Sequence, residues 1–398
     1  MKVAIMGYGT IGSGVAKVLD VNRDVIADHL GDTLDLKYIL DLRDFPDDPH
    51  KDLFVKDYMD IVNDSEVQIV VETMGGVNPA YEFVKAMLLA GKSVTTSNKA
   101  LVADKGVELT KIAAEHNCNF VFEAAVGGGI PIIRTINACL TADIIEEVSA
   151  ICNGTTNYML TKMEKNGSDY ADVLKEAQDL GYAEKDPTAD VEGFDSCRKI
   201  AILTSLITGH QVKFEKIPTQ GISKISAVDF KYAKAMNRSI KLLARAVKTG
   251  DTYTCRVAPF MLPEDHTLFH VSGVMNAVYI RGNMLGDSMY YGAGAGSLPT
   301  ASAVAADMVF LARNTNRVVP VKWDEQELAI GDNMAETYRF FVRTGASQSE
   351  IEEVFGNVEY ANLDLDDETG FVTEMISESS FEQLSKSLGE IKSYIRLA

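Results

Sequence analysis

Basic residues are in short supply in this sequence. Its 398 residues include 38 lysines and arginines against 57 aspartates and glutamates, so the formal net charge is −19 at pH 7. Nucleic acids and anionic membrane surfaces are bound through basic patches. The charge balance therefore argues against both kinds of partner, and any small anion would have to be held by a local feature of the chain.

Cysteine and histidine are also sparse and are not spaced as metal ligands. The six histidines form no HExxH pattern, and no CxxC pair occurs among the five cysteines, Cys118, Cys139, Cys152, Cys197 and Cys255. An odd number of scattered cysteines is typical of reduced thiols rather than of a disulfide framework or a zinc cluster. We therefore expect a cytoplasmic protein.

Long apolar runs are missing too. The N-terminal residues MKVAIMGYG lack the apolar region of a signal peptide, and no stretch reaches the roughly 18 uninterrupted apolar residues of a membrane span. Hydrophobic residues nevertheless make up 46% of the chain and charged residues 24%. This composition allows two or three globular domains with buried cores.

A glycine motif near the N-terminus points to a nucleotide. Residues 2–6 have the pattern of a short buried strand, and Gly7, Gly9 and Gly12 then form a GxGxxG motif that opens a helix. In this arrangement the glycines let backbone N–H groups approach a pyrophosphate at the helix N-terminus. The motif predicts dinucleotide binding, with an ordinary tight turn as the alternative.

The end of the next predicted strand, residues 36–40, bears on the choice of dinucleotide. An acidic residue here usually binds the ribose hydroxyls of NAD, whereas an arginine usually binds the 2′-phosphate of NADP. The sequence offers Asp41 and, two residues later, Arg43. The pattern fits NAD and NADP alike.

The first 130 residues alternate between predicted strands and helices. Further strands are predicted at residues 67–72, 92–96 and 119–123, which together favour a parallel sheet of the Rossmann type over residues 1–130. Ligands gather at the carboxyl ends of such strands. Lys99 follows one of these ends, so it either faces the cofactor crevice or is a solvated loop lysine.

Two other segments are rich in glycine. Residues 124–131 (AAVGGGIP) can turn tightly and present carbonyl oxygens to a hard cation, or can simply join two domains. Residues 290–300 (YYGAGAGSLPT) lead into a predicted helix at 301–312. The second loop could supply N–H groups to the cofactor from another side.

Charge is concentrated at residues 181–199 (GYAEKDPTADVEGFDSCRK), directly before an apolar run. We expect a helix to begin near Asp195, so that Asp195 and Lys199 share one helix face. The pair is either a surface ion pair or a lysine at the rim of the core that is suited to proton transfer. The five carboxylates of the stretch are Glu184, Asp186, Asp190, Glu192 and Asp195.

The remaining chain is predicted to form two more domains. Residues 131–320 read as a mixed α+β domain, from which residues 299–315 are expected to pack back on the first domain. Residues 335–398 follow the order strand, helix, strand, strand, helix, strand, with the second strand at 358–365. This βαββαβ order is that of a ferredoxin-like unit, which could bind a regulator or only stabilise the fold.

Six motifs, taken in order, resemble those of homoserine dehydrogenases. They are the N-terminal GxGxxG, SNKAL (97–101), AAVGGGIPII (124–133), NGTTNY (153–158), the acid-rich stretch and GxGAGxxPT (292–300). The resemblance runs to about Arg313. It implies an α/β fold with a Rossmann-type domain, an α+β catalytic and dimerisation domain and an ACT-like C-terminal domain, assembled as a homodimer or homotetramer.

The resemblance also implies a reaction and the residues that carry it. L-homoserine and L-aspartate 4-semialdehyde would be interconverted by hydride transfer with NADP or NAD, and Lys199 would be the proton donor. Glu184 and Asp195 would hold the substrate, with Lys99 beside it. The dinucleotide would contact Gly7, Gly9, Thr10, Ile11, Gly12, Arg43, Lys99, Gly181 and Gly294. The main-chain oxygens of Glu123, Val126, Gly128 and Ile130 would hold a sodium or potassium ion.

The sequence departs from the pattern of the family at two places. No basic residue stands directly at the end of the second strand, where Leu40 and Asp41 lie. In the C-terminal unit the resemblance implies an Asp-Arg-Pro-Gly turn, but residues 343–346 are RTGA here. This difference weakens the case for feedback control by threonine.

Two other functions are alternatives to this one. A non-catalytic sensor would not need Glu184, Asp195 and Lys199 together. A semialdehyde dehydrogenase would need a nucleophilic cysteine, for which no cysteine here is well placed.

Overall fold

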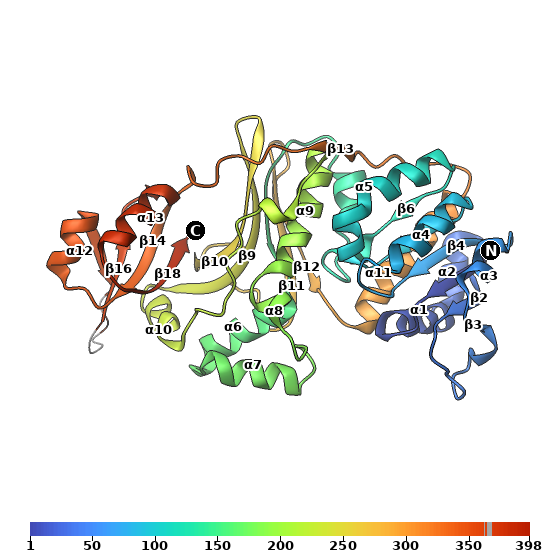
Figure 1. Cartoon of the computed structure of the whole chain (residues 1–398), viewed down its shortest axis with the longest axis horizontal. Coiled ribbons are helices and arrows are strands. Elements are labelled where there is room, and N and C mark those ends of the chain that lie inside the picture. Colours follow the sequence, from blue (N-terminus) through green and yellow to red (C-terminus); the bar gives the residue numbers. More distant parts are fainter. Residues whose placement is uncertain (362, 364–367) are drawn as a thin grey trace. The chain divides into compact units, whose positions relative to one another are not determined.

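The computed structural model describes residues 1–361, 363 and 368–398. The chain divides into two units (Figure 1). The first unit consists of Met1–Asp143, Ala201–Phe214 and Tyr290–Leu328, and the second of Ile144–Ile200, Glu215–Met289 and Ala329–Ala398. Within the described residues, no helix combines the length and the apolar character that a membrane crossing requires.

The first unit is built on a parallel sheet of six strands in the order β3-β2-β1-β4-β5-β6. Its central strands are buried along almost their whole length, as expected for strands covered on both faces. The order reverses between β1 and β4, and ligands bind at such a point in open α/β sheets. The strands are β1 (Lys2–Met6), β2 (Asp35–Leu40), β3 (Phe54–Val55), β4 (Val67–Glu72), β5 (Ser93–Thr96) and β6 (Phe120–Val121).

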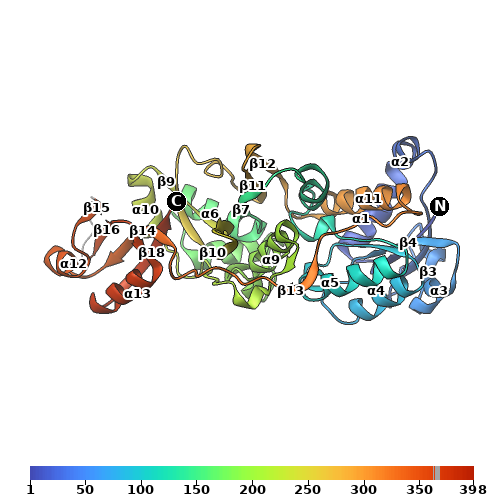
Figure 2. The same ribbon diagram turned by 90° about the horizontal axis from the view of Figure 1, so that it is seen from above.

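Helices cover both faces of this sheet. Figure 2 shows α1 (Thr10–Val21) and α11 (Ser297–Arg313) on one face, and α4 (Ala80–Leu89) and α5 (Lys99–Glu115) on the other. The apolar side chains of α1 and α11 share one core with β1, β2 and β4. The unit also contains α2 (Arg23–Leu30) and α3 (Tyr58–Asn63). The predicted α/β fold is confirmed for this part of the chain.

The second unit contains a mixed sheet of ten strands. At its centre β9 (Arg238–Thr249) and β10 (Thr252–Pro263) form a long antiparallel hairpin. No strand was predicted for residues 238–249, because no regular alternation of polar and apolar residues marks one there. Beside the hairpin lie β7 (Ile145–Ile151), β11 (Met275–Gly282) and β12 (Gly286–Ala293).

The chain forms five helices between β7 and β9, and three of them carry the candidate site. The chain leaves β7 through Asn153 into α6 (Gly154–Asn166) and continues through α7 (Tyr170–Asp179) and the short α8 (Thr188–Val191). It then enters α9 (Phe194–Thr208), which begins where the sequence predicted a helix near Asp195. The fifth helix is α10 (Ala227–Ala235).

The C-terminal residues confirm the predicted βαββαβ order. They form β14 (Thr337–Thr344), α12 (Gln348–Phe355), β15 (Val358–Ala361), β16 (Thr369–Thr373), α13 (Glu378–Ser387) and β18 (Ile391–Leu397), with β17 (Ile376–Ser377) beside β14. The strands are antiparallel in the order β18-β14-β16-β15. Of the strand predicted at 358–365, residues 362, 364 and 365 lie outside the described residues.

The C-terminal strands continue the sheet of the second unit. β18 runs parallel to β10, with Phe260 opposite Arg396 and Met261 opposite Leu397. Two arginines add side-chain links. The Arg343 Nη1 atom donates to Asp229 Oδ1 at 2.9 Å, and the Arg396 Nη1 atom donates to Gln220 Oε1 at 2.8 Å. The three-domain division expected from the sequence stays a prediction.

Candidate active site

Lys199 and Asp195 form a buried ion pair in the first two turns of α9. The Lys199 Nζ atom donates to Asp195 Oδ2 at 2.7 Å and to the main-chain oxygen of Cys152 at 2.6 Å. Only 9% of the lysine side chain and 2% of the aspartate side chain are exposed. The interpretation of this pair as a surface ion pair is therefore wrong, because its environment is the core and not the solvated face of a helix.

The protonation of Lys199 follows from this environment. Burial on its own lowers the pKa of an ammonium, but the adjacent carboxylate of Asp195 outweighs that effect and holds the pKa of Lys199 above its ordinary value. The group is thus an ammonium at neutral pH. An ammonium has three N–H donors, and two of them go to Asp195 and Cys152. One N–H remains to bind an oxygen atom of a ligand.

A second carboxylate, that of Asp190, is tied to this pair through Asn153. The Asn153 Nδ2 atom donates to Asp190 Oδ1 at 2.7 Å and to Asp195 Oδ2 at 2.9 Å. Asn153 is the N-cap of α6, where its Oδ1 atom accepts from the N–H of Thr156 at 2.9 Å. The Asn153 side chain therefore both caps α6 and reaches the acid-rich stretch.

The other two predicted residues of this unit, Gly181 and Glu184, follow α7. The Thr155 hydroxyl donates to the main-chain oxygen of Tyr182 at 2.6 Å, which links the start of α6 to their segment. Glu184 is exposed, and its main-chain oxygen accepts from Gln178 Nε2 at 3.0 Å. The structure thus joins Lys199 and Asp195 directly and leaves the carboxylate of Glu184 at the surface.

In the first unit, the GxGxxG motif forms the turn between β1 and α1. A Cβ atom on Gly12 would overlap the main-chain oxygen of Gly7, so only glycine fits this close approach. No side chain caps α1 at Gly9, and the first N–H groups of any helix lack partners within the helix. Thr10 and Ile11 belong to that first turn. The turn therefore fits a pyrophosphate, which would accept from these N–H groups.

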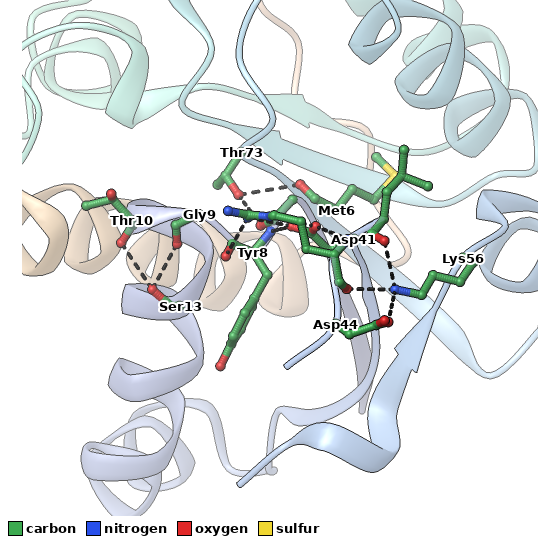
Figure 3. Close-up of polar contacts among 12 residues, drawn as sticks. Met6, Tyr8, Gly9, Thr10, Ser13, Asp41, Asp44, Lys56 and Thr73 are labelled. Atoms are coloured by element: carbon green, nitrogen blue, oxygen red, sulfur yellow. Dashed lines mark hydrogen bonds and ion pairs between the residues drawn. The ribbon is translucent and has the colours of Figure 1, made fainter. Parts of the chain in front are cut away.

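Asp41 follows β2 directly and lies beside Tyr8 (Figure 3), and Arg43 comes two residues later in the chain. The Asp41 carboxylate accepts from the N–H of Tyr8 at 2.8 Å and from the Arg43 guanidinium at 2.8 and 3.0 Å. The hydrogen bonds from Arg43 hold the pKa of Asp41 well below its usual range. Lys56 lies beside them, and its Nζ atom donates to the main-chain oxygens of Leu42 and Arg43 at 3.0 and 2.6 Å.

Lys99 is the first residue of α5 and so is not in a loop. Asn98 caps this helix by accepting from the N–H of Leu101 at 3.1 Å. The cap is held in turn by Thr96, whose hydroxyl accepts from the N–H of Asn98 at 2.9 Å. Thr96 also donates to the buried carboxylate of Glu72 at 2.5 Å. These bonds fix Lys99 at the carboxyl end of β5.

The bend at residues 123–131 is fixed by carboxylates and packs against the second glycine loop. The Glu123 carboxylate accepts from the N–H groups of Ile133 and Arg134 at 2.8 and 2.7 Å. Burial raises the pKa of Glu123 to about 7. A Cβ atom on Gly128 would overlap the main-chain oxygen of Gly294, which shows how close the two loops approach.

The same bend offers main-chain oxygens for a cation. The four carbonyls of the predicted site are those of Glu123, Val126, Gly128 and Ile130, and carbonyl oxygens suit a hard monovalent ion. This site stays a prediction. In the described residues, no group of three or more histidine, cysteine or acidic side chains could hold a metal ion.

Comparison with known proteins identifies the family. Residues 7–123 match the family model "Homoserine dehydrogenase, NAD binding domain", and residues 131–309 match the model "Homoserine dehydrogenase". The homoserine dehydrogenase of Bacillus subtilis (strain 168) is 41% identical over 317 residues, which are 79% of this chain and 73% of the relative. This chain belongs to the homoserine dehydrogenase family.

Solved structures agree with this assignment. A homoserine dehydrogenase from Thiobacillus denitrificans superposes with a TM-score of 0.91 at 33% identity, over 100% of this chain and 98% of the other. A hyperthermophilic archaeal homoserine dehydrogenase in complex with NADPH gives a TM-score of 0.65 at 28% identity, over 78% of this chain and 97% of its own. The predicted family and the assignment to the oxidoreductases are confirmed, and an NAD(P) cofactor follows from the matched domain.

Three groups that contact Lys199, Asp195 or Asn153 were not predicted as site residues. Asn153 was noted only within the NGTTNY motif, Asp190 only as one of five carboxylates, and the carbonyl of Cys152 not at all. The available signals were the membership of Asn153 in that motif and of Asp190 in the acid-rich stretch, whereas Cys152 belongs to neither. Their contacts with Asp195 and Lys199 join residues 42 and 47 positions apart, which no local pattern encodes.

Proposed function

We propose that this chain interconverts L-homoserine and L-aspartate 4-semialdehyde by reversible hydride transfer, with Lys199 as the proton donor. The observation that carries the proposal is the buried Lys199 ammonium, held by Asp195 and the carbonyl of Cys152, with one N–H left over. The ammonium of a surface lysine has no fixed direction, whereas that of Lys199 is directed by two fixed acceptors.

The role of Lys199 follows the charge that develops in the reaction. The bound nicotinamide supplies the hydride to the aldehyde carbon. Negative charge then grows on the aldehyde oxygen, where the third N–H of Lys199 stabilises it and afterwards gives up its proton to form the hydroxyl group. In the reverse direction the neutral amine takes the hydroxyl proton of homoserine.

Carboxylates and a second lysine serve substrate binding in this proposal. Asp195 and Glu184 oppose the α-ammonium group of homoserine or accept from its hydroxyl. Lys99, at the start of α5, lies at the carboxyl edge of the sheet and binds the substrate near the nicotinamide. Gly181 and Gly294 add backbone contacts to the dinucleotide.

We propose NADP as the preferred cofactor. Because the Asp41 carboxylate already accepts from Tyr8 and Arg43, it is not available to the ribose hydroxyls of NAD. The Arg43 side chain is 62% exposed and that of Lys56 is 48% exposed, so both can reach a 2′-phosphate in solvent.

The cation and the assembly belong to the proposal as well. A sodium or potassium ion on the carbonyls of Glu123, Val126, Gly128 and Ile130 would hold the bend beside the second glycine loop. It takes part in no bond change of the reaction. The homodimer or homotetramer and the cytoplasmic location stay predictions.

The test is turnover itself. Purified protein is mixed with homoserine and either NAD⁺ or NADP⁺, and absorbance of the reduced nicotinamide is followed. Lys199→Ala should lower kcat by several orders of magnitude with a far smaller change in KM, since only the transition state carries the oxyanion charge. Lys185→Ala is the matched control, because Lys185 is an exposed lysine of the same acid-rich stretch.

Each outcome has a clear meaning. Turnover in wild type and in Lys185→Ala, with loss in Lys199→Ala, supports the proposal. Turnover at the wild-type rate in Lys199→Ala removes this lysine from the mechanism. Binding of the dinucleotide without any turnover in wild type would favour the sensor function instead.

A further inference from the structure

Asn153 occupies a position between two acidic side chains and a helix terminus. Its side chain makes four hydrogen bonds and the residue is only 6% exposed. Its Oδ1 atom accepts from the N–H and the hydroxyl of Thr156 at 2.9 and 3.0 Å. These two donors fix which end of the amide faces the helix. The NH₂ group must therefore point toward the acidic residues.

That NH₂ group is shared by two carboxylates. One hydrogen goes to Asp190 Oδ1 at 2.7 Å and the other to Asp195 Oδ2 at 2.9 Å. Two carboxylates so close to one atom repel each other, and in a buried position that repulsion is weakly screened. A neutral donor between them lowers the cost of keeping both ionised.

The same NH₂ group also sets the direction of Asp195. Asp195 Oδ2 accepts from Asn153 and from Lys199 at once, so the two bonds fix the plane of the carboxylate. Without the bond from Asn153 this carboxylate loses one of the restraints on its direction. The Lys199 ammonium, which depends on Asp195 for one of its two acceptors, would then be held less precisely.

We infer that Asn153 is a positioning residue of the reaction. Its amide N–H groups hold Asp190 and Asp195 apart and direct Asp195, so that the third N–H of Lys199 stays aimed at the substrate oxygen. This inference rests on the proposed role of Lys199. Asn153 touches neither the substrate nor the cofactor in this role and acts through the two carboxylates.

The experiment separates the capping role of the Asn153 Oδ1 atom from the role of the Asn153 NH₂ group. Asn153→Ser and Asn153→Asp both keep an oxygen acceptor for the helix N-terminus and remove the two donors. Thr156→Val is the matched control, because it removes the hydroxyl bound to Asn153 Oδ1 and leaves the NH₂ group in place. We expect kcat for homoserine oxidation to fall about 10- to 100-fold in both Asn153 variants, as for other small misplacements of catalytic groups. Thr156→Val should keep kcat and lose only thermal stability.

The pH dependence gives a readout that a purely structural role would not produce. At pH 8 Asn153→Asp places a third carboxylate beside two others, so its kcat relative to wild type should be lowest there. As pH falls toward 6 one of the three carboxyls takes up a proton and becomes an O–H donor. The ratio of variant to wild type should then rise several-fold, whereas the ratio for Asn153→Ser should stay flat.

The outcomes distinguish this inference from the proposed function. If wild type turns over homoserine and both Asn153 variants match its kcat between pH 6 and 8, the positioning role is overturned and the proposed function stands. Equal loss of kcat in the Asn153 variants and in Thr156→Val, with no change in pH profile, also overturns it. If wild type shows no turnover, the proposed function fails and the inference fails with it.

Discussion

At the scale of single residues, Lys199 differs from other lysines of the chain by its surroundings. An exposed pair four residues apart on a helix contributes only about 0.3–0.5 kcal/mol to stability. A buried pair behaves differently, since removal of one partner leaves an uncompensated charge and costs about 3–5 kcal/mol. Asp195 and Lys199 form a buried pair of this kind. Each residue is therefore needed for folding and for the charged state of its partner.

The raised pKa of Lys199 predicts different pH dependences for the two directions of the reaction. Because the pKa of Lys199 in the folded protein lies above the ordinary value of about 10.4, the lysine stays protonated from pH 6 to 9. Reduction of aspartate 4-semialdehyde should therefore keep a constant kcat over this range. Oxidation of homoserine needs the neutral amine, so its kcat should rise with pH. Steady-state rates in both directions test this, and a fall in the reductive kcat centred below pH 9 would contradict it.

Arg43 predicts which dinucleotide is preferred. Arg43→Ala should lower kcat/KM for NADP about 10- to 100-fold, because a charge-assisted hydrogen bond to phosphate contributes about 1.5–3 kcal/mol. The value for NAD should hardly change or should rise, since Asp41 gains freedom to bind ribose. Arg23→Ala is the control, as Arg23 is an exposed arginine that pairs with Asp35 at 2.7 Å. Equal losses with both cofactors would show that Arg43 serves only the local fold.

At the scale of elements, the acid-rich stretch is held from two sides. Asn153 and Thr155 bind it from the start of α6, as described above. From the other side comes the loop at residues 217–225, where the N–H of Ile222 donates to the main-chain oxygen of Val191 at 2.8 Å. Gly221 in this loop has no room for a side chain, because a Cβ atom would overlap the oxygen of Val191 and the Cα atom of Glu192. Helix α9, which carries Asp195 and Lys199, therefore begins from a segment that both neighbours fix in place.

Gly221→Ala tests whether this fit matters. The added methyl group must displace Val191 or Glu192, and overpacking of this kind costs about 1–3 kcal/mol. We expect a lower midpoint of thermal unfolding and a lower kcat, since Asp190 and Asp195 flank the displaced residues. Ser223→Ala, an exposed position in the same loop, should change neither. An unchanged kcat in Gly221→Ala would mean that the acid-rich stretch tolerates movement at this point.

At the scale of the whole molecule, the C-terminal residues 335–398 (the C-terminal unit) belong to the second of the two structural units and continue its sheet. The archaeal homoserine dehydrogenase aligns over 97% of its own chain but only 78% of this one, so the family fold can be complete over a shorter length. In this chain, β18 instead joins the sheet beside β10, and Arg396 forms a bidentate pair with Glu378 while it contacts Gln220. Loss of this unit would expose the edge of the buried strand β10.

A single buried ion pair tests how firmly the C-terminal unit is attached. The Arg343 side chain is 8% exposed and Asp229, on α10, is fully buried. Arg343→Met should lower the free energy of unfolding of the second unit by about 3–5 kcal/mol, because Asp229 would stay buried without its cation. The double variant with Asp229→Asn should regain part of that loss. Urea unfolding followed by circular dichroism measures both, and equal stability of wild type and Arg343→Met would show that the link contributes nothing.

The sequence by itself determined the features that depend on neighbours along the chain. The buried strand 2–6 with Gly7, Gly9 and Gly12, the shared helix face of Asp195 and Lys199, and the βαββαβ order at the C-terminus were all predicted and are all present. Each is encoded within a few residues by the periods of strands and helices and by the special backbone of glycine. The resemblance of six motifs added the family.

Only the tertiary structure decided what those features do. The spacing of Asp195 and Lys199 is the same for a solvated pair and a buried one. In the structure the buried pair contacts Cys152 and Asn153, which lie far away in the sequence. Likewise, the hydrogen bonds from Tyr8 to Asp41 and from Asn153 to Asp195 join residues that are distant in sequence. Strand β9 has no local period that would predict it. Such contacts arise when elements pack against one another, and therefore no short stretch of sequence contains them.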